Sequence, residues 1–197
     1  MPMPLSRRTL LSCLLWPGLA MAQDRPLVLE GQPLVRRLNS ARGELLLNGA
    51  GVRQAAWFKA FVVALYLGQR TADVAAAQAM PGPKRLQLRM LQELPAAEFA
   101  KALRKGVARN TADAELDALL PQLERLSASI TALDKVRRGD VIDLDLDTTA
   151  GMLFGLNGTL RSPPFPGSVL FAAVLRSFIG EHPYDARLKA ALMGSTA

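Results

Sequence analysis

The stretch LLLNGAGVRQAAWFKAFVVALYL, from Leu45 to Leu67, decides the fold. Its second part, residues 57–67, is an almost unbroken apolar run with aromatic and β-branched side chains, which predicts a buried strand. Its first part places Asn48-Gly49, a common turn pair, directly after a short leucine run. The sequence therefore predicts a turn at Asn48-Gly49, followed by a buried strand at 57–67.

The rest of the chain carries recognisable strand and helix periodicities. Strands are expected near 27–30, 86–90, 141–147, 152–156 and 159–162, and helices over 72–80 (with Thr71 as N-cap), 95–110, 116–130, 169–179 and 185–193. Strands come early and late, helices lie between them and at the end, and no strand-helix-strand alternation appears. This order predicts an α+β fold with a largely antiparallel sheet.

Composition and charge exclude several classes of protein. Of the 197 residues, 50% are hydrophobic, and 24 basic against 17 acidic residues give a formal charge of +7. This composition is neither collagen-like nor disordered. The chain has a single cysteine, Cys13, which cannot form an internal disulfide. Because there is no second cysteine, four-cysteine metal sites and CxxC redox motifs are excluded. The sequence therefore implies no cofactor and no resident metal.

The N-terminus reads as a secretory signal. Ser6-Arg7-Arg8 precedes an apolar stretch, and a small-x-small site ends at Ala22, so we expect cleavage there and a single domain over 23–197. The paired arginines are typical of the twin-arginine pathway, which implies a periplasmic protein. The alternative, a membrane anchor, is disfavoured because the apolar run is short and broken by Pro17-Gly18. We thus expect no stable membrane insertion after cleavage.

Cleavage would also change the charge argument. It removes Arg7 and Arg8, so the formal charge falls from +7 to +5. An exported location argues against a nucleic-acid partner, which a basic composition alone would leave open. The sequence says nothing about the oligomeric state.

Two polar features have a catalytic and a structural interpretation. Asp143, Asp145 and Asp147 alternate along one strand, so they favour a solvated sheet face over a metal site, which would need a loop that gathers its ligands. His182, the only histidine, lies in a predicted loop without a nucleophile motif nearby. No Gly-x-Ser-x-Gly motif supports a serine hydrolase.

The most specific local pattern is Gly49-Ala50-Gly51-Val52-Arg53. Glycines allow a backbone or a ligand to approach closely. An arginine beside an apolar wall is a strong anchor for a carboxylate or a phenolate. An ordinary turn with a surface arginine would give the same pattern, and the residues alone leave both interpretations open.

Several segments together resemble the chalcone isomerase family, and specifically its exported bacterial chalcone-isomerase-like branch. They include Leu47–Arg53, Trp57-Phe58-Lys59, Ala64–Leu67, the helix over 96–110 and Val174–Gly180. The resemblance covers residues 45–193. It implies an open-faced β-sandwich in which helices back a large antiparallel sheet, with a ligand cleft between sheet and helices.

The resemblance carries over functional residues unevenly. Arg53 matches the arginine that steadies the anionic substrate in the plant enzymes, and Ser177 keeps a hydroxyl on the last long helix. Phe61 and Phe99 stand where that family has a threonine and a tyrosine, and Gly106 stands where it has an asparagine. Each lost donor to a developing oxyanion costs about 10²-fold or more in rate. The resemblance therefore favours a binder over a catalyst.

Three hypotheses follow from this resemblance. The first is a non-catalytic protein that binds a small amphipathic or anionic, fatty-acid-like ligand, with Arg53 as the anchor. The expected ligand-binding residues are Arg53, Trp57, Phe61, Tyr66, Phe99, Ser177 and Phe178. The second is an intramolecular lyase or isomerase that uses Arg53 and Ser177 on an unknown substrate. The third is an envelope interaction protein whose cleft is vestigial.

Overall fold

The computed structural model describes residues 25–40, 43–55 and 57–194 of the chain. The predicted signal segment and Cys13 lie outside these residues. The strands are β1 (Leu27–Leu29), β2 (Gln32–Leu34), β3 (Arg37–Ser40), β4 (Gly43–Ala55), β5 (Phe58–Leu67), β6 (Lys84–Met90), β7 (Leu94–Pro95), β8 (Lys135–Val136), β9 (Val141–Asp147), β10 (Gly151–Leu156) and β11 (Thr159–Leu160). The helices are α1 (Val74–Ala79), α2 (Ala96–Arg109), α3 (Asp113–Thr131), α4 (Val169–Ile179) and α5 (Ala186–Leu192).

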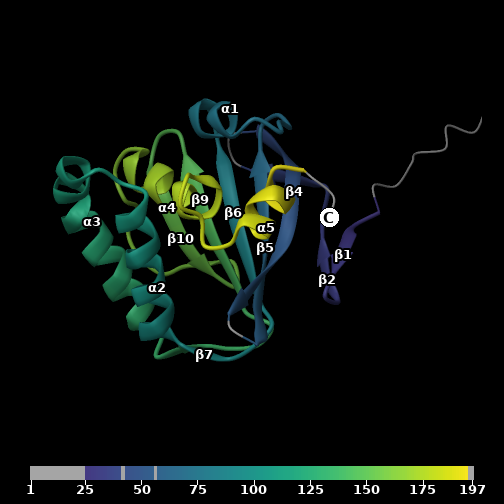
Figure 1. Ribbon diagram of the computed structural model, residues 1–197, viewed down its shortest axis with the longest axis horizontal. Coiled ribbons are helices and arrows are strands. Elements are labelled where there is room, and N and C mark those ends of the chain that lie inside the picture. The colour runs from purple at the N-terminus through teal and green to yellow at the C-terminus, as the bar shows by residue number, and fades with distance from the viewer. Residues whose placement is uncertain (1–24, 41–42, 56, 195–197) are drawn as a thin grey trace, which may run out of the picture.

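A seven-stranded antiparallel sheet is the centre of the fold, with strand order β11-β10-β9-β6-β5-β4-β3. Helices α2 and α4 cover one face of it, α3 packs on both of them, and α5 packs on β4 (Figure 1). The two-stranded β1–β2 hairpin lies to the side, beyond β4 (Figure 1). This arrangement confirms the predicted α+β fold with a large antiparallel sheet.

The two faces of the sheet bury different clusters, and the alternation along β5 separates them. Residues 61, 63, 65 and 67 point toward the helices and join the main core. Residues 62, 64 and 66 point the other way and pack in a smaller cluster with side chains of β4 and of the β1–β2 hairpin. Because successive strand side chains alternate between faces, each residue from Phe61 to Leu67 belongs to one cluster only.

The prediction of a turn at Asn48-Gly49 is wrong. Strand β4 continues through this pair, and its register with β5 shifts between Leu47 and Gly49, which marks a β-bulge. Asn48 is buried: its Nδ2 donates to the carbonyl of Leu192 at 2.8 Å and its Oδ1 accepts from the N–H of Thr71 at 2.8 Å. The pair therefore joins β4 to the end of α5.

The N-cap of the first helix also differs from the prediction. Asp73, not Thr71, caps α1, because its Oδ1 accepts from the N–H of Ala75 at 2.8 Å. The Thr71 hydroxyl instead accepts from the N–H of Asp73 at 3.0 Å.

Across the described residues, none of the helices combines the length and apolar character that crossing a membrane requires.

Candidate functional site

An apolar cavity of about 190 Å³ lies between the sheet and helices α2 and α4. Inward-facing residues of β5, β6 and β9 form its floor, α2 and α4 form its walls, and the chain after α4 closes one end. Its lining comprises Arg53, Phe58, Ala60, Phe61, Leu88, Leu94, Glu98, Phe99, Ala102, Leu103, Leu144, Phe178 and Tyr184. Such concave apolar sites with few polar groups are typical of small-molecule binding.

Four of the sequence-predicted ligand-binding residues line this cavity: Arg53, Phe61, Phe99 and Phe178. The rings of Phe61 and Phe99 meet edge to face, with centroids 6.0 Å apart. Both positions therefore present aromatic carbon to the cavity, where the resemblance to chalcone isomerases would require hydroxyl groups. The cavity wall lacks those two donors.

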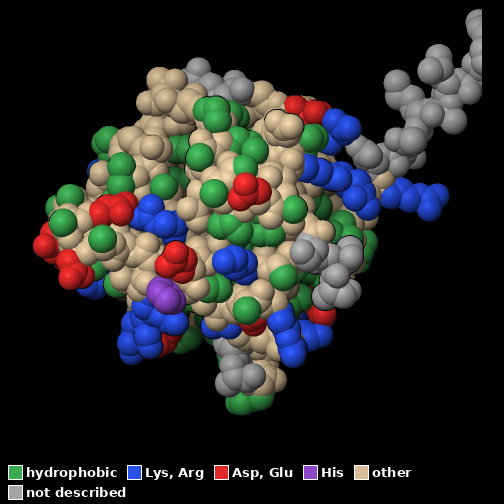
Figure 2. Space-filling view, turned by 45° about the horizontal axis from the view of Figure 1, so that its top comes forward, with side chains coloured by type: hydrophobic (Ala, Val, Ile, Leu, Met, Phe, Trp, Pro, Cys, Tyr) green, Lys and Arg blue, Asp and Glu red, His purple; other side chains and the backbone are tan. Residues whose placement is uncertain are grey.

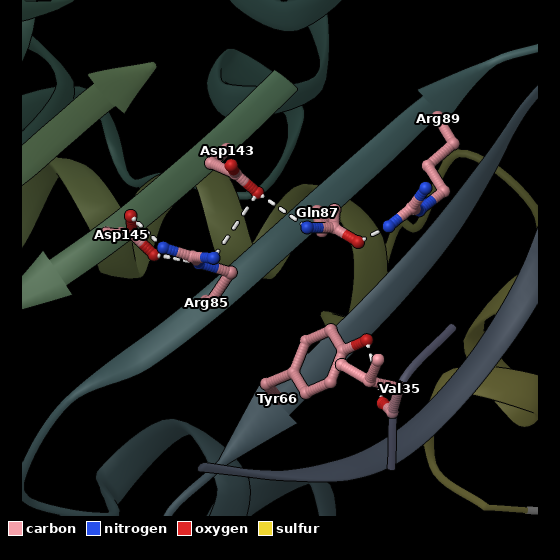
Figure 3. Close-up of polar contacts among 7 residues, drawn as sticks. All are labelled: Val35, Tyr66, Arg85, Gln87, Arg89, Asp143 and Asp145. Carbon is pink, nitrogen blue, oxygen red and sulfur yellow. Dashed lines mark hydrogen bonds and ion pairs between the residues drawn. The ribbon is translucent and has the colours of Figure 1, made fainter. Parts of the chain in front are cut away.

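Three other predicted residues lie elsewhere. Trp57 precedes β5 and is 91% exposed. Tyr66 points to the opposite face of the sheet, because it differs from Phe61 by an odd number of strand positions, and its hydroxyl donates to the carbonyl of Val35 at 3.1 Å (Figure 3). Ser177 is fully buried, and its hydroxyl donates to the carbonyl of Ala173 at 3.3 Å. None of these three residues lines this cavity.

Tyr184 is a cavity residue that the sequence analysis missed. Its hydroxyl donates to the carbonyl of Ala102 at 3.1 Å, and its ring packs against Phe178 with centroids 5.1 Å apart. Gly106 makes room for it, because a Cβ at that position would lie 2.3 Å from the tyrosine oxygen. The missing side chain of α2 is thus replaced by an aromatic ring from the chain after α4.

Asn110 holds this chain segment in place. Its Nδ2 donates to the carbonyls of Gly106 at 2.9 Å and His182 at 2.8 Å, and its Oδ1 accepts from the N–H of His182 at 2.9 Å. Asn110 therefore closes α2 and fixes the backbone two residues before Tyr184. It is not among the residues that line the cavity.

Arg53 stands at the mouth of the cavity, half-buried at the end of β4. Its guanidinium lies 5.7 Å from the centre of the Tyr184 ring, within the range of a cation–π contact. One of its N–H groups donates to the backbone carbonyl of the neighbouring Gln54. Glu98 also lines the mouth, and its carboxylate lies 3.9 Å from the ammonium of Lys101. Arg53 is the one cation among the described residues that line the cavity.

Burial raises the pKa of Tyr184 to about 12, although the nearby Ser177 hydroxyl and the charges of Arg53 and Arg109 act in the opposite direction. The chain has only two tyrosines, so we expect the tyrosinate absorbance of a Tyr66→Phe variant to rise near pH 12 in the folded state. An apparent pKa near 10, the ordinary value, would contradict the buried position of Tyr184.

The same shift predicts how stability depends on pH. The folded-state pKa exceeds the unfolded one, so as pH rises from about 10 to about 12 the unfolded chain loses its proton first. The free energy of unfolding should therefore fall over this window. The fall should be smaller in a Tyr184→Phe variant, and denaturant titrations at several pH values would measure the difference.

The aspartates of β9 do not form a freely solvated face. The Arg85 guanidinium donates to both oxygens of Asp145, one at 2.8 Å, and lies 3.7 Å from Asp143 (Figure 3). Gln87 bridges Asp143 and Arg89 (Figure 3). Burial raises the pKa of Asp145, and Arg85 opposes this rise. The expectation of a solvated face is thus corrected for Asp143 and Asp145, whose carboxylates are partly buried and paired with Arg85 and Gln87.

Within the described parts of the chain, no group of three or more metal-ligating side chains lies close enough to hold an ion. His182 is exposed and lies in the loop after α4.

Comparisons with known proteins agree with this architecture. No curated protein matches the sequence. Among solved structures, the crystal structure of an Arabidopsis thaliana fatty-acid binding protein matches with a TM-score of 0.67 and 15% sequence identity, covering 86% of this chain and 97% of that one. At this identity the match shows a shared fold. A family model described as chalcone isomerase-like matches residues 27–194, which span the seven-stranded sheet and the five helices of the described residues, so the chain belongs to the chalcone isomerase-like family.

Proposed function

We propose that this protein binds a small amphipathic anion, such as a fatty acid with a short chain, without converting it chemically. The observation that carries the proposal is an apolar cavity with an arginine at its mouth: among the described lining residues, Arg53 is the one cation. A carboxylate can pair with its guanidinium while the alkyl chain enters the apolar interior. The fold shared with a fatty-acid binding protein supports this choice of ligand.

The size of the cavity limits the ligand. Its volume of about 190 Å³ is below the roughly 300–1,000 Å³ of sites for drug-sized ligands. A short alkyl chain suits this space, whereas a long chain requires the aromatic side chains to move apart. We therefore expect affinity to peak at short or medium chain length.

The hydroxyl groups near the cavity do not favour catalysis. Phe61 and Phe99 cannot donate hydrogen bonds, and the Ser177 hydroxyl is buried in contact with its own helix. The Tyr184 hydroxyl donates to the carbonyl of Ala102. Stabilising a developing oxyanion requires donors aimed at the reacting oxygen. Binding is thus the function that this geometry supports better than isomerisation.

We further propose that the protein acts outside the cytoplasm, in the periplasm, after removal of residues 1–22. The basic, apolar and small-x-small parts of the N-terminal sequence support this location. Comparing the masses of the cytoplasmic and exported forms in a bacterial host would test both the export and the cleavage site.

The binding proposal is tested by titrating the chain from Gln23 with saturated fatty acids of increasing length in a calorimeter. Arg53→Met should weaken binding by about 10- to 100-fold, since a hydrogen bond to a charged group contributes about 1.5–3 kcal/mol. Arg161→Met, which removes an exposed arginine away from the cavity, is the matched control and should change nothing. Methyl esters of the same acids should bind wild type and Arg53→Met equally.

Two outcomes would overturn the proposal. If no fatty acid binds, or if Arg53→Met binds them as well as wild type does, Arg53 is not the anchor. If the wild type closes a chalcone faster than solution does, and Arg53→Met does not, the lyase hypothesis takes its place.

A further inference from the structure

A second and larger groove, of about 690 Å³, lies along the edge of β4 that does not pair with β5. The β1–β2 hairpin forms one wall through Leu27 and Leu29, and α5 forms the other through Leu188 and Ala191. Between them lie β4 residues Asn48 to Val52 and Gln54. The floor of this groove is thus a strand backbone, and its walls are partly apolar.

The backbone in this groove is a free sheet edge. Strand β3 pairs with β4 only from Gly43 to Leu46, and one more bond joins the N–H of Leu47 to the carbonyl of Arg36 at 2.9 Å. From Gly49 to Gln54, β4 pairs with β5 on one side, with Asn48 as the extra residue of the bulge, and no strand of the described chain pairs with the other side. Unpaired strand edges are templates for an additional strand.

The groove is also strongly basic. Arg36, Arg70 and Arg187 line it, against a single acidic residue, Asp185. The Asp185 carboxylate is already used, because it accepts from the N–H groups of Arg187 and Leu188 as the N-cap of α5. Figure 2 shows Lys and Arg side chains gathered on the side of the molecule where Figure 1 places β1 and β2. The groove therefore carries three cations against one carboxylate, a formal charge of +2.

We propose that the edge of β4 between Asn48 and Gln54 binds an extended acidic segment of a partner protein as an additional strand. The free backbone would supply main-chain hydrogen bonds, and alternate side chains of the segment would face the hairpin wall and the α5 wall in turn. Seven residues of strand span about 23 Å, which sets the length of the bound segment. This inference does not depend on the ligand of the apolar cavity.

A second copy of the same chain fits the groove poorly. In a symmetric dimer the same patch meets itself, so Arg36, Arg70 and Arg187 would face the arginines of the other copy. Like charges in direct opposition are destabilising. The charge of the groove thus favours a partner of the opposite sign.

The test uses an acetylated, amidated seven-residue peptide that alternates glutamate and valine, and follows backbone amide signals of the 23–197 chain by NMR. We expect the signals of Asn48 to Gln54 to shift on titration, with slower hydrogen exchange along this edge. Arg70→Glu and Arg187→Glu should each weaken binding at least tenfold, because both side chains are exposed and lie on the groove. Arg161→Glu, away from the groove, is the control for net charge.

Three further measurements test the proposal. The same peptide with alternate backbone nitrogens methylated should bind at least tenfold more weakly, because it cannot donate the main-chain hydrogen bonds. Equal binding would overturn strand pairing and would show that charge attraction alone holds the peptide. A lysine-for-glutamate peptide that binds as well would overturn the acidic preference. Absence of any shift along β4, or displacement of the peptide by a fatty acid in the Arg53→Met background, would overturn the proposal and would favour a lipid in this groove.

Discussion

Replacing Gly49 with alanine should lower the free energy of unfolding by about 3 kcal/mol, the upper end of the usual cost of overpacking. A Cβ at this position would lie 2.1 Å from the carbonyl oxygen of Ala191 and 2.6 Å from that of Leu192. Both atoms belong to the backbone at the end of α5, so no side-chain rotation can relieve the contact. The helix would have to move away from β4, and the hydrogen bond from Asn48 to Leu192 would be lost with it.

Gly68→Ala is the matched control for this substitution. Gly68 follows β5, and a Cβ there would meet nothing within 4 Å. We expect its free energy of unfolding to stay within about 0.5 kcal/mol of wild type. Urea denaturation of both variants measures the difference, and a Gly49→Ala protein as stable as wild type would show that α5 is not held against this strand.

The position of Gly49 changes the interpretation of the motif that contains it. From the sequence, these glycines could admit either a backbone or a ligand. In the structure it is α5 that approaches: Gly49 meets its backbone, and a Cβ on Gly51 would lie 2.9 Å from side-chain atoms of Leu188 and Ala191. The glycines thus hold a helix against β4, and Arg53 is the part of the motif that reaches the cavity.

Local patterns predicted the fold well, because most of it follows from alternation and helical spacing. The alternating stretch 141–147 became β9, and the helix predicted over 95–110 became α2, with Phe99, Leu103 and Val107 on its buried side. The turn predicted at Asn48-Gly49 was wrong because turn propensity is a local property of the residue pair. The strand stays extended through buried contacts of Asn48 with Leu192 and Thr71, which come from distant parts of the chain.

The site was predictable only in part. Phe61 and Tyr66 lie in one apolar run, and counting alternate positions from Phe61 would have placed Tyr66 on the other face. Tyr184 gave no periodic signal, because it lies in the loop between α4 and α5. The one available clue was Gly106: a glycine inside a helix costs about 1 kcal/mol relative to alanine, so on the buried face of α2 it indicates that another group needs the space.

Removing the Tyr184 ring should have the second large effect. We expect Tyr184→Ala to lower the free energy of unfolding by about 3 kcal/mol, the lower end of the range for deleting a buried aromatic ring, because this ring is only partly buried. It would lose its contact with Phe178, its cation–π contact with Arg53 and its place beside Gly106. Denaturant titration measures the loss.

The same variant should also change which ligands bind, since Tyr184 forms one wall of the cavity. Without the ring, the cavity extends into the space beside Gly106, so the optimal fatty-acid chain should become longer than in wild type. Tyr184→Phe is the control: it keeps the wall, loses the hydroxyl bond to Ala102, and should cost only about 1 kcal/mol with an unchanged chain-length preference. If Tyr184→Phe shifted that preference as far as Tyr184→Ala does, the hydroxyl and not the ring would determine the shape of the site.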